Sequence, residues 1–503
     1  MALKSLLALC AAALAAPAGA PGPQAVDPAA EGGLRVWRFE GTDLGSFRVL
    51  ALVGVGSRDE PEDQTGISHF LEHCLFNGTD LRTGAELTEG LRDRGGDYNG
   101  VTTQEYTAYW VQVPVTEWRF AVEWLAEILT RPALDADEVD DERRIVYEEI
   151  DTRHPHVRSL TFESLIFGRH PLGRTIGGDA ERFDEIRVED LKRWYGRYYH
   201  AENLVVAWSG LAPEEACSQL IRAGFAGLPA SGERPERASP RPITGAEYVA
   251  RGDDDDGFLL AGYSVPPGGA GELASMLVLE QVLREAVHHE VREERHLAYA
   301  PDVELVAFSD VWQMRTNVEV SDVGNLVSAW EGVQEVFGGL AQIEQNRFER
   351  ARQDASNRLL AGGPDALRRV TALSWLLVLG GDESPDLPGA VRAVDREDAL
   401  AWAASSFTAE RRFLLSDGAE LVGFPLLALV LLLVLAGAAG VFGLRRRLPR
   451  IRWRRARRRR PPRGRLIQGN FAAEAEAAER ELQEYFRQQD HGQESGDEPT
   501  SGV

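Results

Sequence analysis

The five residues HFLEH, from His69 to His73, are the most specific chemical signal in the chain. On a helix, His69 and His73 are one turn apart and project from the same face, so both imidazoles can reach one metal ion. Glu72 lies on that side as well, where its carboxylate can hold a water molecule and accept its proton. This order, H-x-x-E-H, inverts the commoner zinc motif H-E-x-x-H. The other faces carry apolar residues that can anchor the helix in a core: Phe70, Leu71, Cys74 and Leu75.

A catalytic zinc site needs a third protein ligand, and a second helical pattern offers two candidates. In residues 137–150 (DEVDDERRIVYEEI), Glu142 and Glu149 share one face with Val139, Val146 and Ile150. Two acids seven residues apart on an apolar stripe are unusual for a solvated helix. Glu149 lies 76 residues beyond His73.

This combination resembles the family of pitrilysin, insulin-degrading enzyme and the mitochondrial processing peptidase, including the similar bacterial peptidases. That family pairs HxxEH with a glutamate about this far downstream and with a second glutamate seven residues earlier. The resemblance implies that His69, His73 and Glu149 bind Zn²⁺ and that Glu72 is the general base. It also implies that Glu142 orients one of the ligands.

Three further segments extend the resemblance, which covers the chain from Val36 to about Phe413. They are GGDYNGVTTQEYTAYW (95–110), HPLGRTIGG (170–178) and NLVVAWSG (203–210). The first is similar to the family's substrate-binding strand, so Asn99 is expected to contact the backbone of an extended peptide by β-augmentation. We therefore expect a peptide or an unfolded protein segment as substrate.

The segment VREERHLAYA (291–300) contains Arg292 and Tyr299, seven residues apart. In the family, such a pair comes from the half that faces the zinc half and resembles oxyanion stabilisers. The alternative is a surface helix end with a core tyrosine. Family enzymes enclose substrate between two halves, whereas this chain is one half that carries both motifs. We expect a homodimer in which each chain supplies its pair to the other; a heterodimer with a zinc-less relative is the alternative.

The 503-residue chain is long enough for two or three domains. Strand patterns (108–113, 203–209, 257–265) and helix patterns (117–129, 275–287) occur in both halves. We expect an α+β fold with two similar domains, each an antiparallel sheet covered by helices, plus one C-terminal transmembrane helix. The N-terminal peptidase domain with the zinc site spans 34–228, and the peptidase-like domain with the Arg/Tyr pair spans 245–417. A Pro/Ser/Arg-rich stretch between them, 229–242, reads as a linker.

Both ends of the chain carry targeting patterns. Residues 1–20 combine Lys4, a short apolar run and Ala-Gly-Ala, which predicts a signal peptide; an uncleaved anchor is the alternative. Leu421–Leu444 has no charge and is long enough to span a membrane. Thirteen arginines between Arg445 and Arg465 predict that the segment 445–503 is cytoplasmic. The peptidase domains are then extracytoplasmic, or periplasmic, on a single-pass protein of the inner membrane.

The net charge of −24 is concentrated before the membrane segment, so we expect no nucleic-acid partner for the ectodomain. Cys74 and Cys217 read as buried hydrophobic residues, although a bridge between them is possible. The run Asp253–Asp256 reads as a solvated turn. The remaining candidate histidines read as structural: His154, His156, His170 and His200.

The function expected from these patterns is that of a membrane-anchored zinc endopeptidase. Two alternatives belong to other classes. One is a catalytically inactive peptide-binding or scaffold subunit of a peptidase complex. The other is a membrane adaptor whose Arg-rich tail binds anionic lipid or nucleic acid.

Overall fold

The structure is a computed structural model that describes residues 24–25, 33–39, 45–152, 163–241, 246–250, 257–361, 363–381 and 386–417. The expected signal peptide, transmembrane segment and Arg-rich tail lie outside these residues, as do His154, His156 and the run Asp253–Asp256. Among the residues that are described, no helix is long and apolar enough to cross a membrane.

The first domain contains a six-stranded sheet in the order β1-β2-β6-β3-β5-β4. Its strands are β1 (Gln24–Ala25), β2 (Arg35–Arg38), β3 (Ser46–Val53), β4 (Asp97–Thr102), β5 (Thr107–Pro114) and β6 (Leu204–Ser209). The strands β3 and β6 are buried along almost their whole length, because helices lie on both faces of the sheet. By contrast, β4 is the last strand on its side of the sheet.

The second domain contains a five-stranded sheet in the order β7-β11-β8-β10-β9. Its strands are β7 (Ala246–Ala250), β8 (Gly257–Val265), β9 (Asp302–Ala307), β10 (Trp312–Val320) and β11 (Arg412–Asp417). Counted from β2 and from β7, both sheets have the strand order 1-5-2-4-3. This identical order supports the expectation of two similar domains.

The expected antiparallel sheets are confirmed for all strand pairs except one in each domain. The strand pairs β2–β6 and β7–β11 are parallel, and all other strand pairs are antiparallel. Each parallel pair joins the first and last of these five strands. The whole domain lies between those two strands, which gives the chain enough length to return in the same direction.

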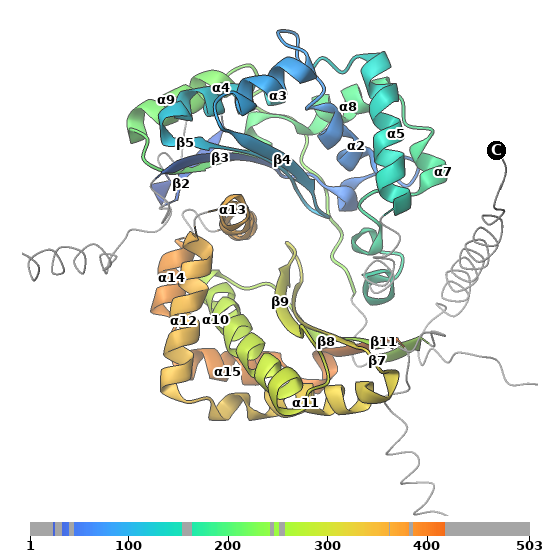
Figure 1. Ribbon diagram of the computed structural model, residues 1–503, viewed down its shortest axis with the longest axis vertical. Helices are drawn as coiled ribbons and strands as arrows, with labels where there is room; N and C mark the ends of the chain where they lie inside the picture. The colour runs from blue at the N-terminus through green and yellow to red at the C-terminus, as the bar shows by residue number, and fades with distance from the viewer. Residues whose placement is uncertain are drawn as a thin grey trace, which may run out of the picture.

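Helices cover the outer face of each sheet (Figure 1). On the first domain they are α2 (Ile67–Cys74), α3 (Gly84–Arg92), α4 (Trp118–Thr130), α5 (Ala136–Thr152), α7 (Ala180–Phe183), α8 (Val188–Tyr198) and α9 (Glu214–Phe225). On the second they are α10 (Ala270–Val287), a π-helix (His288–Glu294), α11 (Leu326–Gly339), α12 (Gln345–Leu360), α14 (Leu387–Ala393) and α15 (Arg396–Ser406). Within the described residues, each segment expected to be a helix or a strand takes that form, with ends shifted by a few residues.

The inner face of the first sheet is covered by a helix from the second half of the chain, α13 (Pro364–Leu379) (Figure 1). Apolar residues of α13, including Trp375, share one core with Leu50, Leu52 and Val205 of the sheet. The indole ring fits because Gly54 has no side chain: a Cβ there would lie 2.9 Å from the ring. The sequence analysis did not foresee that this helix packs on the sheet of the other domain.

In return, a segment of the first domain, residues 163–172, packs against the second sheet. Phe167 and Leu172 of that segment pack against Phe413 and Leu415 of β11. An ion pair reinforces this contact, since Arg315 Nη2 of β10 lies 3.0 Å from Oε2 of Glu163. The two domains therefore share their cores through an exchange of covering segments.

The segment between the domains, residues 229–241, runs along the first domain without regular secondary structure. Two of its carbonyl groups contact histidines that were expected to be structural, His200 and His170. Nε2 of His200 lies 2.8 Å from O of Glu233, and Nε2 of His170 lies 2.8 Å from O of Ala238. The cysteines Cys74 and Cys217 are buried and unpaired, so the possible disulfide is not formed.

Candidate metal centre

Helix α2 carries the HxxEH residues and packs between helix α5 and strand β4. Its apolar side is fully buried, and this packing fixes the rotation of the helix. His69 and Glu72 are themselves buried, and His73 is partly buried. The two imidazole rings lie edge to face with centroids 4.7 Å apart. The sequence thus places two nitrogen donors side by side on one surface of the helix.

Helix α5 packs across α2 and brings a carboxylate to these imidazoles. Oε2 of Glu149 lies 3.2 Å from Nε2 of His73, and Oε1 lies 3.9 Å from Nε2 of His69. One ligand atom from each of the three residues lies within 4.8 Å of the others, and no other such group occurs in the described part of the chain. Four ligands at about 2.1 Å from a tetrahedral zinc are about 3.4 Å apart, so this donor set fits the ion.

Glu142 lies two helical turns before Glu149 on α5 and contacts His73 at Nδ1, the ring nitrogen that faces away from Glu149. Its Oε1 lies 2.8 Å from Nδ1 of His73, and Asn77 donates to its Oε2 at 2.8 Å. Burial raises the pKa of Glu142, but the hydrogen bonds from His73 and Asn77 outweigh burial and hold it below its usual value. A proton on Nδ1 leaves Nε2 with its lone pair toward Glu149, which is the tautomer that a metal requires.

Glu72 is held by strand β4, which passes directly beneath its carboxylate. The hydroxyl of Thr102 donates to Oε2 of Glu72 at 2.6 Å. At Gly100, a Cβ would lie 2.5 Å from Oε1 of Glu72, so a larger residue would displace the carboxylate. Sequence reasoning missed both residues, although they lie in the segment 95–110 that resembled a substrate-binding strand.

Asn99 directly precedes Gly100 on β4 and is exposed. It pairs with Trp110 of β5, and its Oδ1 accepts a hydrogen bond from the N–H of Gly100 at 2.9 Å. Because β4 ends the sheet, its outer edge is the side on which an extended chain could pair. A cavity of about 610 Å³ opens beside it, lined by residues that include Phe76, Tyr98 and Glu138.

The structure does not bring Arg292 and Tyr299 to this cluster within one chain. Arg292 lies on the π-helix that follows α10, and its guanidinium stacks 4.5 Å from the ring centroid of Tyr299. Its Nη1 also lies 3.4 Å from Nε2 of His288. Tyr299 is 81% exposed, so the alternative reading of a core tyrosine is wrong. The two residues form a pair on the second domain, in which Tyr299 is exposed and Arg292 is partly buried.

Comparisons with known proteins identify the class that this fold and site define. Residues 46–179 match the family described as "Insulinase (Peptidase family M16)", and residues 185–354 match "Peptidase M16 inactive domain". The chain belongs to this insulinase-type peptidase family, as its resemblance implied.

Two curated relatives and one solved structure illustrate the relationship. An uncharacterized zinc protease of Mycobacterium bovis is 32% identical over 293 residues, which are 56% of this chain and 66% of that protein. The probable mitochondrial-processing peptidase subunit beta of Arabidopsis thaliana is 30% identical over 261 residues, 50% of this chain and 49% of that protein. The chain thus spans between half and two thirds of these relatives. The crystal structure of a peptidase M16 inactive domain from Pseudomonas fluorescens shares the fold, with a TM-score of 0.68 at 17% identity, over 78% of this chain and 97% of that one.

Proposed function

We propose that the chain is a zinc-dependent endopeptidase that hydrolyses peptides or unfolded protein segments. One observation carries the proposal: donor atoms of His69, His73 and Glu149 converge within 4.8 Å, with Glu72 beside them on the same helix. This set provides three protein ligands, as catalytic zinc sites do, and a carboxylate placed for proton transfer. The names of curated relatives as zinc proteases support the same metal.

When bound, zinc supplies Lewis-acid polarisation of the scissile carbonyl and makes water more acidic. The protein's own residues then have distinct tasks. Glu142 keeps His73 in the tautomer that directs Nε2 to the metal. Glu72 takes a proton from the attacking water and returns it to the leaving amine. Thr102 holds one oxygen of Glu72, which limits the orientations of the base.

The edge of β4 supports the proposed substrate class. A peptide that pairs with this edge presents its backbone along Asn99 and passes over the carboxylate of Glu72. Backbone pairing requires an extended segment and selects shape more than sequence. The cavity beside Tyr98 could accept a side chain of that peptide.

We also propose that the active unit is a dimer in which Arg292 and Tyr299 act on the zinc site of the partner chain. The support is the exposed ring of Tyr299 and the guanidinium of Arg292 that stacks on it. Donors of this kind stabilise the charge that develops on the carbonyl oxygen. A heterodimer with a zinc-less relative is the alternative partner arrangement.

The proposed location follows from the charge-free segment 421–444 and the arginines behind it. The peptidase domains lie outside the cytoplasm and the tail inside, on a single-pass inner-membrane protein. Protease added to intact spheroplasts should remove the peptidase domains and leave a protected fragment that a C-terminal tag detects. Protection of the peptidase domains would contradict this orientation.

The decisive test combines metal analysis with cleavage of an unstructured fluorogenic peptide by the purified full chain in detergent. The wild type should bind about one zinc per chain and cleave the peptide. Glu149→Gln should lose most of both. Glu148→Gln, an equal charge change at the neighbouring residue of α5, is the matched control and should keep them. A folded wild type that neither binds zinc nor cleaves would favour the inactive peptide-binding subunit.

A further inference from the structure

Helix α2 is short and cannot supply its own N-terminal cap. It has eight residues, and its N-cap residue is Gly66 with φ of +93°, which is left-handed backbone. A Cβ at Gly66 would lie 2.5 Å from the carbonyl oxygen of Gly177, so no capping side chain fits there. The third helical position, which carries the glutamate of a capping box, is His69. Neither position that usually caps a helix can do so here, because Gly66 has no side chain and His69 is a proposed metal ligand.

Glu60 takes over both capping roles from the loop before the helix. Its Oε2 accepts from the N–H of Gly66 at 2.7 Å, and its Oε1 accepts from the N–H of Ser68 at 2.9 Å. These donors would otherwise be unsatisfied groups at the start of a buried helix. Burial raises the pKa of Glu60 to about 8, while the two N–H groups and Arg174 favour the carboxylate. The chain thus keeps an ionisable group in a fully buried place.

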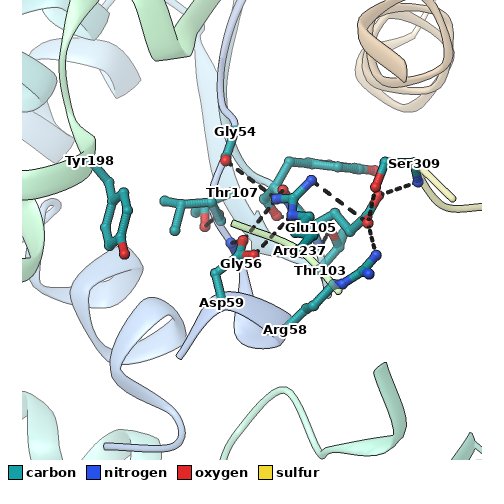
Figure 2. A network of polar contacts seen from close by, with 12 residues as sticks. Gly54, Gly56, Arg58, Asp59, Thr103, Glu105, Thr107, Tyr198, Arg237 and Ser309 are labelled. Carbon is teal, nitrogen blue, oxygen red and sulfur yellow. Dashed lines mark hydrogen bonds and ion pairs between the residues drawn. The ribbon is translucent and has the colours of Figure 1, made fainter. Parts of the chain in front are cut away.

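The two residues before Glu60 connect the same loop to the rest of the molecule (Figure 2). Asp59 accepts two hydrogen bonds from Arg237 of the interdomain segment, at 2.8 and 2.9 Å. Arg58 donates to Glu105 of the first domain and to Asp310 of the second. Glu105 in turn accepts from the backbone N–H of Ser309 at 2.7 Å. Three consecutive residues therefore reach the second domain, the interdomain segment and the metal-ligand helix.

We propose that Glu60 is a positioning residue for the metal centre, and that Arg58 and Asp59 couple it to the junction between the two domains. The inference rests on the proposed function, because His69 and His73 matter only if they bind zinc. Since α2 makes barely two turns, a small shift at its first turn moves both imidazoles relative to Glu149. The placement of the second domain would then affect metal binding without any contact to the metal.

The experiment compares zinc affinities of the full chain by competition with a chelator, at about pH 9, where Glu60 is ionised. In Glu60→Gln, the amide group cannot accept from both N–H donors, so zinc affinity should fall by about tenfold. Asp310→Asn, at the outer end of the same chain of contacts, should lower affinity in the same direction by less. Hydrogen exchange of the peptide that contains α2 should become faster in both variants.

The matched control is Asp395→Ala, which removes the oxygen that caps α15. Asp395 caps α15 through two backbone N–H groups, as Glu60 does for α2, but α15 carries no proposed ligand. This variant should lose stability and keep wild-type zinc affinity. A purely structural role for Glu60 predicts the same result for both caps.

Wild-type zinc affinity in folded Glu60→Gln would overturn the inference and leave the proposed function intact. If that variant does not fold, Asp310→Asn decides: unchanged affinity and unchanged exchange of α2 would equally overturn the coupling. A wild-type chain that binds no zinc would instead remove the proposed function, and the inference with it.

Discussion

Glu72 and Glu280 are buried glutamates on helices at corresponding places of two similar domains. Helix α2 lies between the second and third of the five equivalent strands of the first domain, and α10 lies between the same two strands of the second. Glu72 receives a hydrogen bond from the neutral hydroxyl of Thr102. Glu280 receives hydrogen bonds from two arginines, Arg284 at 3.2 Å and Arg369 at 2.6 Å.

This difference suits a structural role for Glu280 and the proposed catalytic role for Glu72. Two guanidinium groups compensate the charge of Glu280 and tie its carboxylate to neighbouring residues. A hydroxyl donor orients Glu72 without neutralising it, so the group can still take up a proton. The same fold thus carries the proposed metal centre in one domain and an ion-pair network around a buried glutamate in the other.

The largest effect expected from this comparison is in Glu72→Gln. Loss of a general base usually lowers turnover by about 10²–10⁴-fold, whereas the three proposed ligands remain. We expect nearly full zinc content with kcat reduced to this degree, measured by metal analysis and a fluorogenic peptide. Turnover equal to the wild type would show that Glu72 is not the base and would remove the contrast with Glu280.

The next effect tests whether the second domain contributes to catalysis in trans. Arg292→Ala combined with Tyr299→Phe should lower kcat by about 10²–10³-fold. When this double variant exchanges subunits with Glu72→Gln, one site of each mixed dimer has every group. Random pairing makes about half the dimers mixed, so about a quarter of wild-type activity should return. Exchanged mixtures no more active than either parent would argue against this pairing.

A smaller effect is expected at Thr102, whose hydroxyl distinguishes the surroundings of the two glutamates. Thr102→Val keeps the side-chain shape and removes the donor, so kcat should fall by about tenfold with KM nearly unchanged. Thr102→Ser restores the hydroxyl and should recover most of the turnover. Equal kcat in the Val and Ser variants would mean that the hydrogen bond to Glu72 has no catalytic role.

The smallest effect on turnover is expected in Glu280→Gln, although this variant should be the least stable. Removal of one partner from a fully buried ion pair costs about 3–5 kcal/mol, and we expect less here because the side chains of Arg284 and Arg369 are partly exposed to water. Urea unfolding should show this loss, while kcat per folded chain stays at the wild-type value. A large drop in kcat without loss of stability would contradict the structural assignment of Glu280.

The sequence predicted those parts of the site that follow the period of a helix. His69, Glu72 and His73 share one face of α2, and Glu142 and Glu149 share one face of α5. Within each helix, the sequence spacing alone places these side chains on one side. The residues that hold this set lack such a signature. Thr102 comes from a strand 30 residues beyond Glu72, and Glu60 lies in a loop six residues before Gly66, the N-cap residue of α2. Their contacts depend on tertiary packing, which no local pattern encodes.

The fold shows the same limit. Strand alternation and helix periods located main helices and strands of both domains. The similar mix of elements in the two domains indicated a repeated unit. The parallel pairs β2–β6 and β7–β11 were not foreseen, because strand direction depends on the path of the whole domain. The exchange of α13 was not foreseen either, since its apolar residues indicate burial but not a partner.

The exchange of covering segments also sets an order of events during synthesis. The first sheet is complete once β6 ends at Ser209, but its inner apolar face is covered only when α13, starting at Pro364, has emerged. At ribosomal rates of about 5–20 residues per second, that face is exposed for on the order of ten seconds. During this time, the nascent chain exposes an apolar surface that includes Leu50, Leu52 and Val205 and can aggregate. Holding chaperones, or slow release into the compartment where the protein folds, would protect it from aggregation.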